Sequence, residues 1–192
     1  DVASTSFFPA KPLAGYGDGG AIFTNDDEFA SIMKSIRIHG FGKDKYDNIR
    51  IGINGRMDTI QAAILLEKFA IFQNEIELRQ SISEYYSTNI TSHFQKPYIP
   101  KDYISSWAQY SILARSTEHR TRIIKSLKEK DIPSMIYYSI PLHMQKVFKY
   151  LGYNKGDFPV AEKTSSRIFS IPFHPYLIKN QQDKVIEVIN ND

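Results

Sequence analysis

Residues 6–20 read Ser-Phe-Phe-Pro-Ala-Lys-Pro-Leu-Ala-Gly-Tyr-Gly-Asp-Gly-Gly. Lys11 lies between an apolar run and a stretch, residues 15–20, in which four of the six residues are glycine. An amine held against apolar surface loses hydration, which favours its neutral, nucleophilic form, and glycine lets the backbone approach a ligand closely. The segment therefore indicates a lysine that forms a Schiff base with a bound carbonyl compound, against the simpler interpretation of a solvated lysine before a turn.

The sequence on either side of this segment predicts the elements that hold it. Short β-like runs at Val2–Phe8 and Gly20–Thr24 flank the lysine loop. The spaced glycines are also typical of a dinucleotide-binding loop, but that fingerprint requires a helix directly afterwards, and a strand is expected here instead. We therefore expect a tight turn between two strands rather than a dinucleotide site.

Helical periodicity follows the second predicted strand. Acidic residues at 26–28 and apolar residues at i, i+3, i+4 and i+7 predict an amphipathic helix that ends at Gly40. A long helix then opens at Asp58, where residues 58–61 form an acidic variant of the capping box, and its pattern extends to about Thr88. A helix of that length predicts a bridge between two lobes.

The rest of the chain alternates strands and helices, and this order predicts a small α/β sandwich. A helix is expected to start at Ser116, a closing helix to span Asn180–Ile189, and helical or turn-like segments to occupy 141–151 and 160–167. Strands are expected at three places: 108–114, Met135–Tyr138 and Ile168–Ile171.

The composition excludes several classes of protein. The 192-residue chain is 42% hydrophobic, enough for a core, and its net charge of +3 includes no Lys/Arg block, so no nucleic-acid partner is expected. It has no cysteine, which excludes disulfides and cysteine-based metal sites or nucleophiles. No apolar run approaches the roughly 18 residues of a membrane span, and no signal peptide is visible. We expect no membrane association and a cytoplasmic location.

The first residue is not methionine, and the chain opens inside a predicted strand, from which we expect it to be a fragment. None of its five histidines has an i, i+4 partner, and no acidic cluster accompanies them, so no metal site is expected.

Ser6, Asn54 and Arg56 are candidates for binding an anion. Ser6 precedes Lys11 by five residues, and its hydroxyl could donate to a phosphate; a hydrogen bond to backbone is the alternative. Asn54 and Arg56 lie in a loop before the long helix. An amide and a guanidinium suit phosphate or carboxylate, which arginine binds bidentately, whereas a plain polar turn would give the same pattern.

Tyr138 and His143 are weaker candidates on a segment that continues through Pro141. His143 could contact a substrate oxygen, and a purely structural histidine is the equal alternative.

Taken together, six ordered segments resemble the second half of a sugar-nucleotide aminotransferase of the DegT/DnrJ type, an enzyme dependent on pyridoxal 5'-phosphate (PLP). The nearest likeness is to the UDP-2-acetamido-2-deoxy-3-oxo-glucuronate aminotransferases, which install a 3-amino group on a UDP-linked N-acetylated uronic acid. The resembling segments are Ser6–Ala21, Ile36–Gly40, Asn54–Ala63, Trp107–Ile112, Tyr137–His143 and Phe158–Glu162.

The resemblance implies the C-terminal part of a fold-type I PLP-dependent transferase, an α/β fold like that of aspartate aminotransferase. Residues 1–78 would be the end of the large PLP-binding domain with its connecting helix, and residues 79–192 the small α/β domain. The implied reaction moves an amino group from an amino acid, with glutamate the expected donor, to a keto sugar nucleotide in amino-sugar and lipopolysaccharide biosynthesis for the cell envelope. The implied assembly is a homodimer with shared active sites.

The resemblance also implies roles by position. Lys11 would bind PLP covalently and move the proton between the substrate carbon and the cofactor. Ser6 would hold the cofactor phosphate, and Asn54 would reach the same phosphate from the partner subunit. Arg56 would face the sugar, where a uronate carboxylate suits a guanidinium fork. Two further residues would lie on the substrate side: Tyr138 and His143.

The family's first half carries an acidic partner for the pyridine nitrogen, an aromatic group stacked on the ring and much of the phosphate site. We therefore expect the isolated chain to be inactive or nearly so. Some relatives replace the cofactor lysine and catalyse dehydration, so the presence of Lys11 favours transamination. Two alternatives remain: a PLP-sensing regulator of the same fold without transaminase activity, and an α/β binding module whose Lys11 is inert.

Overall fold

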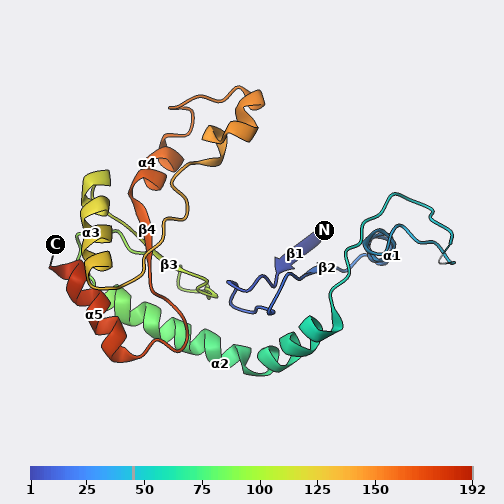
Figure 1. Ribbon diagram of the computed structural model, residues 1–192, viewed down its shortest axis with the longest axis horizontal. Helices are drawn as coiled ribbons and strands as arrows, with labels where there is room; N and C mark the ends of the chain where they lie inside the picture. Colours follow the sequence, from blue (N-terminus) through green and yellow to red (C-terminus); the bar gives the residue numbers. More distant parts are fainter. Residues whose placement is uncertain (45, 192) are drawn as a thin grey trace. The chain divides into compact units, whose positions relative to one another are not determined.

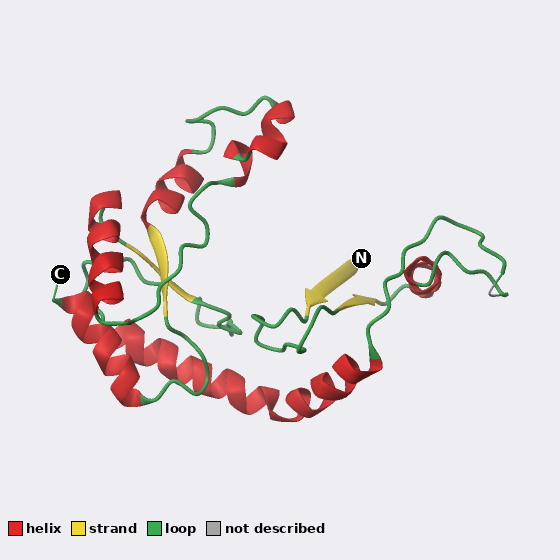
Figure 2. Ribbon diagram, viewed as in Figure 1, coloured by secondary structure: helices red, strands yellow, loops and turns green. Residues whose placement is uncertain are grey.

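The computed structural model describes residues 1–44 and 46–191 (Figure 1). The chain forms two compact units, Asp1–Gln73 and Asn74–Asp192, each with its own strands and helices. Figure 2 shows this mixture of helix and strand in both. The boundary between the units falls inside one long helix.

The first unit opens with a hairpin. β1 (Val2–Ser6) pairs antiparallel with β2 (Gly20–Thr24), and the register places Ser6 opposite Gly20, where the lysine loop leaves the strands. The tight turn between two strands expected from the sequence is thus a longer closed loop. The first strand ends two residues earlier than expected because the chain turns after Ser6, with the N–H of Lys11 donating to the carbonyl of Phe8 at 2.8 Å.

Helix α1 (Asp27–Arg37) follows β2 directly. The carboxylate of Asp26 accepts the N–H of Phe29 at 2.9 Å, which caps the helix, and acidic residues in the first turn and basic residues in the last complement its dipole. The helix therefore begins and ends where charge and capping favour it, three residues before the expected end at Gly40.

Helix α2 (Thr59–Asn89) confirms the long helix expected from Asp58 to about Thr88. Its first half lies in the first unit, where Leu65 is buried, and its second half carries Ile82 and Tyr86 into the core of the second unit.

The second unit is built around two short antiparallel strands. β3 (Tyr110–Leu113) pairs with β4 (Ile168–Ile171). Three α-helices and two 3-10 turns complete the unit, and their positions agree with the expected helical segments. They are α3 (Thr117–Glu129), η1 (Leu142–Met144), η2 (Lys146–Leu151), α4 (Pro159–Arg167) and α5 (Lys179–Asn190).

A continuous apolar core fills the second unit. Tyr86, Tyr110 and Phe169 are fully buried, and the ring centroids of the two tyrosines lie 5.3 Å apart. The hydroxyl of Tyr86 donates to the carbonyl of Pro172 at 3.0 Å, so this buried polar group is satisfied. Burial raises the pKa of Tyr86, which keeps the hydroxyl neutral.

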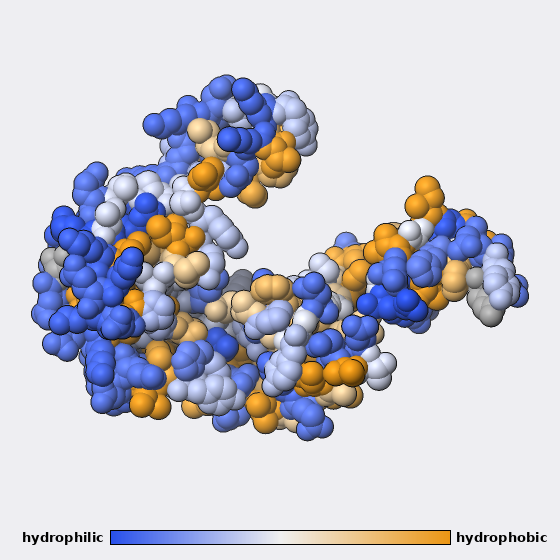
Figure 3. Space-filling model, in the orientation of Figure 1, coloured by the Kyte–Doolittle hydropathy of each residue, from blue (hydrophilic) through white to orange (hydrophobic). Residues whose placement is uncertain are grey.

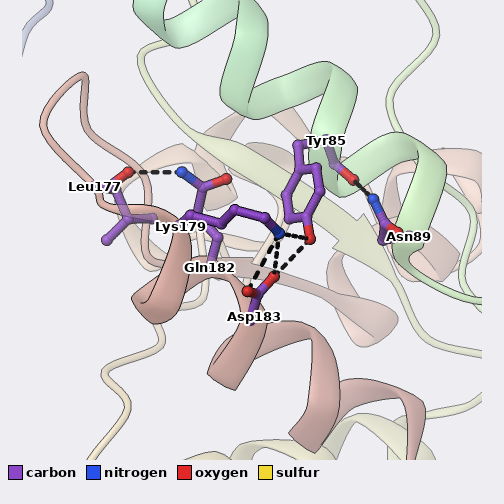
Figure 4. A network of polar contacts seen from close by, with 6 residues as sticks. All are labelled: Tyr85, Asn89, Leu177, Lys179, Gln182 and Asp183. Carbon is purple, nitrogen blue, oxygen red and sulfur yellow. Dashed lines mark hydrogen bonds and ion pairs between the residues drawn. The ribbon is translucent and has the colours of Figure 1, made fainter.

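A polar cluster at the surface of the second unit ties α5 to α2 (Figure 4). Lys179 Nζ contacts both the hydroxyl of Tyr85 and the carboxylate of Asp183, and it lies 4.2 Å from the centroid of the Tyr85 ring. Because these groups are exposed, the cluster adds orientation to the packing of the two helices more than stability.

The prediction of a strand at Met135–Tyr138 is wrong. Met135 makes a single bridge to Ser170, with N–H···O distances of 3.1 and 2.7 Å, and no ladder follows. A strand needs repeated pairing along its length, and β4 is paired along its other edge with β3. β-Propensity of the Ile-Tyr-Tyr run was therefore insufficient to make it a strand.

Large apolar side chains remain at the surface of both units, and Figure 3 shows them in orange. No helix within residues 1–44 and 46–191 is long and apolar enough to cross a membrane.

Candidate functional site

The loop that carries Lys11 is closed at its base by backbone hydrogen bonds. The N–H of Phe7 donates to Gly19, and the N–H of Gly15 donates to Phe7, both at 2.8 Å. Within the loop, Ala14 and Gly15 are buried, whereas Lys11 is exposed. Among the described residues, Nζ of Lys11 has no hydrogen bond or ion pair, so the amine is available to a ligand.

This exposure corrects one step of the sequence argument. The neighbouring apolar residues were expected to shield Lys11 from water, but Phe8 is itself 51% exposed. Within the described part of the first unit, the neighbouring apolar residues therefore leave Lys11 exposed to water.

Ser6 lies at the last position of β1, at the entrance to the same loop. Its Oγ accepts the N–H of Phe8 at 3.2 Å, which holds the side chain beside the turn. A hydroxyl that accepts one hydrogen bond still has its proton to donate. Ser6 can therefore both brace the turn that leads to Lys11 and donate to an anion.

Asn54 and Arg56 are in direct contact. Nε of Arg56 donates to Oδ1 of Asn54 at 2.8 Å. A guanidinium has no acceptor, so Asn54 must present its oxygen to Arg56, and its NH2 group is left facing elsewhere. The pair thus offers a ligand N–H donors, from the amide and from the guanidinium fork, which suit a phosphate or a carboxylate.

Close backbone contact between the end of α1 and residues 50–55 positions this pair. The N–H of Ile53 donates to Ile36 at 2.8 Å, and the N–H of Gly55 donates to Arg37 at 2.8 Å. A Cβ on Gly52 would lie 2.2 Å from the nitrogen of Gly40, so only glycine permits the approach. The local sequence identifies Asn54 and Arg56 as donors, and this backbone contact fixes their position relative to α1.

Tyr138 and His143 lie in the second unit, where both line an open, largely apolar cavity of about 1270 Å³. Tyr138 is 72% exposed, whereas the side chain of His143 is only 8% exposed and its Nε2 lies 3.0 Å from Oε1 of Glu162. Glu162 also accepts the N–H of Gly156 at 2.8 Å, and this bond contributes most to lowering the pKa of Glu162. His143 therefore anchors the η1 segment to α4.

Gln61 is a contributor that sequence reasoning did not place. Its Oε1 accepts the N–H of Tyr16 at 2.7 Å, so the first turn of α2 contacts the glycine part of the lysine loop. The sequence favoured a helix-capping role for Gln61. The two residues are 45 positions apart, and no local pattern indicates that they meet.

The residues of the first unit fit the chemical groups of PLP. The amine of Lys11 has no partner among the described residues and suits an aldehyde, and the donors of Ser6 and of the Asn54–Arg56 pair suit a phosphate. Within residues 1–44 and 46–191, no group of three or more His, Cys, Asp or Glu side chains is arranged to hold a metal ion.

Comparison with known proteins identifies two curated relatives of interest. The UDP-2-acetamido-2-deoxy-3-oxo-D-glucuronate aminotransferase of Pseudomonas aeruginosa is 44% identical over 177 residues, which are 92% of this chain and 47% of that protein. A pleiotropic regulatory protein of Geobacillus stearothermophilus is 39% identical over 189 residues, 98% of this chain and 50% of that protein. The chain spans about half the length of the curated relatives it matches.

Solved structures share the fold. A DegT DnrJ EryC1 StrS aminotransferase from Brucella abortus superposes with a TM-score of 0.93 at 48% identity, covering 99% of this chain and 50% of that one. The NtdA protein of Bacillus subtilis, solved with bound cofactor PMP, superposes with a TM-score of 0.85 at 30% identity, covering 98% of this chain and 45% of that one. The fold is thus that of PLP-dependent aminotransferases. Because residues 1–190 match the family model, the chain belongs to the DegT/DnrJ/EryC1/StrS aminotransferase family.

Proposed function

We propose that this chain is the C-terminal half of a PLP-dependent aminotransferase that transfers an amino group to a keto sugar nucleotide. The observation that carries the proposal is Lys11, whose amine has no partner among the described residues and which lies in a loop closed by backbone hydrogen bonds. PLP, when bound, supplies an electron sink at the substrate carbon. The protein supplies the amine, the anion donors and their positions.

Each residue has a stated task in this proposal. Nζ of Lys11 binds the cofactor and then carries the proton to and from the substrate carbon, which requires an amine that cycles between protonated and neutral forms. Ser6 donates to the cofactor phosphate. Asn54 reaches the same phosphate from the partner subunit of a homodimer, and Arg56 pairs with a substrate carboxylate.

Tyr138 and His143 remain on the substrate side of the proposal. Tyr138 presents an exposed ring and hydroxyl at a cavity. The ring of His143 is committed to Glu162 through Nε2, so a substrate contact would have to use Nδ1.

The substrate we propose is a UDP-linked 3-keto N-acetylated uronic acid, with glutamate as the amino donor, in the biosynthesis of cell-envelope polysaccharide. The 44% identity to a UDP-2-acetamido-2-deoxy-3-oxo-D-glucuronate aminotransferase supports this class, and the Asn54–Arg56 donors suit its carboxylate. The cytoplasmic location belongs to the same proposal and is tested by cell fractionation. The 192-residue chain alone is expected to be inactive, because half of the enclosure is supplied by the rest of the protein.

The experiment uses the full-length protein, by which we mean the longer polypeptide that contains this chain. We expect it to absorb visible light when loaded with PLP, to lose that band after borohydride, and to yield PLP on the peptide that contains Lys11. Addition of glutamate should bleach the band, and a UDP-linked keto sugar should restore it. A dTDP-linked sugar serves as the competing substrate.

A regulator that binds PLP without transamination is the second candidate, and the 39% identity to a pleiotropic regulatory protein favours it. Such a protein would carry PLP on Lys11, yet its visible band would be unchanged by any amino donor.

A further inference from the structure

The loop that carries Lys11 is fastened at a second point, by a side chain from α2. Gln61 lies in the first turn of that helix, and its Oε1 accepts the N–H of Tyr16 at 2.7 Å. With the hydrogen bonds of Phe7 to Gly19 and of Gly15 to Phe7, the loop therefore has two attachments at its own base and one to a distant segment. Lys11 lies on the stretch of chain between these attachments.

Two glycines of the loop leave the space that the carboxamide of Gln61 occupies. A Cβ on Gly15 would lie 3.0 Å from Oε1 of Gln61, and a Cβ on Gly17 would lie 3.3 Å from Nε2. Both distances are shorter than ordinary van der Waals contact, so any side chain at either position would press on the carboxamide. The absence of side chains at Gly15 and Gly17 thus leaves room for the carboxamide of Gln61.

The chain just before Gln61 lies close to the end of the lysine loop. A Cβ on Gly19 would lie 3.1 Å from Sδ of Met57. Met57 directly follows Arg56, so residues 56–61 carry a proposed substrate contact at one end and the fastening of the lysine loop at the other. A displacement of residues 56–61 would therefore move both the proposed substrate contact and the bond from Gln61 to Tyr16.

We propose that Gln61 is a positioning residue that holds the loop of Lys11 against the first turn of α2. The inference rests on the proposed function, because the position matters only if Lys11 acts on a bound cofactor. Gln61 acts through the backbone of Tyr16 and need not touch cofactor or substrate. What the role requires is an acceptor atom at that reach, since the N–H of Tyr16 is a donor.

Two substitutions separate the acceptor from the bulk of the side chain. Gln61→Met keeps length and volume but removes the oxygen, and Gln61→Glu keeps an oxygen at the same reach. Gln109→Met is the matched control, because Gln109 is an exposed glutamine of the second unit.

Hydrogen exchange of the 192-residue chain tests the fastening without any cofactor. We expect the amide of Tyr16 to exchange about tenfold faster in Gln61→Met, as loss of one hydrogen bond would give. Gln61→Glu should restore most of the protection, and Gln109→Met should leave it unchanged. Equal protection in Gln61→Met and the unsubstituted chain would overturn the proposal.

Kinetics of the loaded full-length protein test the consequence. In Gln61→Met we expect kcat to fall about tenfold and PLP release to quicken by a similar factor, because a misplaced amine loses alignment. KM for the sugar nucleotide should change less than twofold, and Gln61→Glu should rescue both effects. A loosened loop with unchanged kcat and PLP release would overturn the positioning role.

The two arms also separate this inference from the proposed function. Failure of the unsubstituted full-length protein to load PLP on Lys11 would count against the proposed function, and the positioning role would fall with it. A normal PLP load on Lys11 with no effect of Gln61→Met would overturn the inference alone.

Discussion

Each of the two units is stabilised by a different kind of internal interaction. The second buries a continuous apolar cluster in which Tyr110 and Phe169 have no exposed surface. The described part of the first unit buries apolar side chains only at Ala14 and Leu65, and it leaves Ile22 57% exposed. Its geometry comes from backbone hydrogen bonds, close glycine contacts and a few polar side chains.

This difference indicates that the second unit supplies most of the stability, while the first carries most of the candidate site residues. Apolar burial contributes roughly 25 cal/mol per Å², so the second unit has a large source of stability of its own. The first unit carries Lys11, Ser6 and the Asn54–Arg56 pair on backbone that little apolar contact supports. Substitutions in the first unit should therefore change binding and rate, and substitutions in the core of the second should change folding.

The largest expected effect comes from Lys11→Ala in the full-length protein. Groups that transfer protons contribute about 10²- to 10⁴-fold to rate, and covalent PLP would be lost as well, so we expect transamination to fall at least about 10³-fold. Initial rates and the visible band measure this. Lys43→Ala, at another exposed lysine of the first unit, should keep both. Normal turnover in Lys11→Ala would remove Lys11 from the chemistry.

The opposite case is Phe169→Ala, which empties the middle of the second unit's core. We expect the free energy of unfolding to fall by about 3–5 kcal/mol, because a fully buried aromatic ring is removed and a cavity is left. Urea denaturation of the 192-residue chain measures it, with Tyr150→Ala, at a 79% exposed tyrosine, as the control. The amide of Tyr16 should keep its exchange rate; faster exchange there would show that the units do not fold separately.

A pair of glycines sharpens the comparison between the units. Gly40 and Gly152 share a φ of +77°, but a Cβ on Gly40 would lie 1.8 Å from the carbonyl oxygen of Arg50, whereas nothing lies within 4 Å of one on Gly152. Gly152→Ala should cost about 1 kcal/mol of backbone strain. Gly40→Ala should cost at least about 2 kcal/mol and free the Ile53 amide to exchange. Equal costs would show that the close approach near the anion donors is unimportant.

Arg56→Lys tests specificity within the proposed function. A lysine keeps the charge but loses the planar fork that suits a carboxylate. We expect KM for a keto uronate nucleotide to rise about tenfold while KM for the matching sugar without a carboxylate stays the same. A parallel rise for both sugars would place Arg56 away from the uronate.

The smallest expected effect is the pH dependence set by Glu162. Hydrogen bonds from Gly156, and then from His143, lower the pKa of Glu162 in the folded protein. A lowered carboxyl pKa adds stability that is present above the unfolded value of about 4.5 and is lost as pH falls through the folded value. Urea unfolding at pH 7, 4.5 and 3 should therefore show a shallower acid decline in Glu162→Gln than in the unsubstituted chain. Identical slopes would contradict it.

The sequence by itself determined most of the elements, the strand expected at Met135–Tyr138 being the exception, and it identified the chemically active residue types. Capping at Asp26 and Ser116 and the periodicity of α1 depend on neighbours within a few residues, so the positions of these elements were predictable. The six segments that resemble the aminotransferase family are likewise local patterns, and the family assignment made from them is confirmed.

Only the tertiary structure decided which residues meet. The bond between Gln61 and Tyr16, the commitment of His143 to Glu162 and the failure of Met135–Tyr138 to form a strand depend on partners 19 to 45 residues away. Such contacts form when folding brings distant segments together, and they leave no periodic trace in either segment. Exposure of Lys11 belongs to the same class, because a neighbour in sequence shields an amine only if the fold turns both toward the same surface.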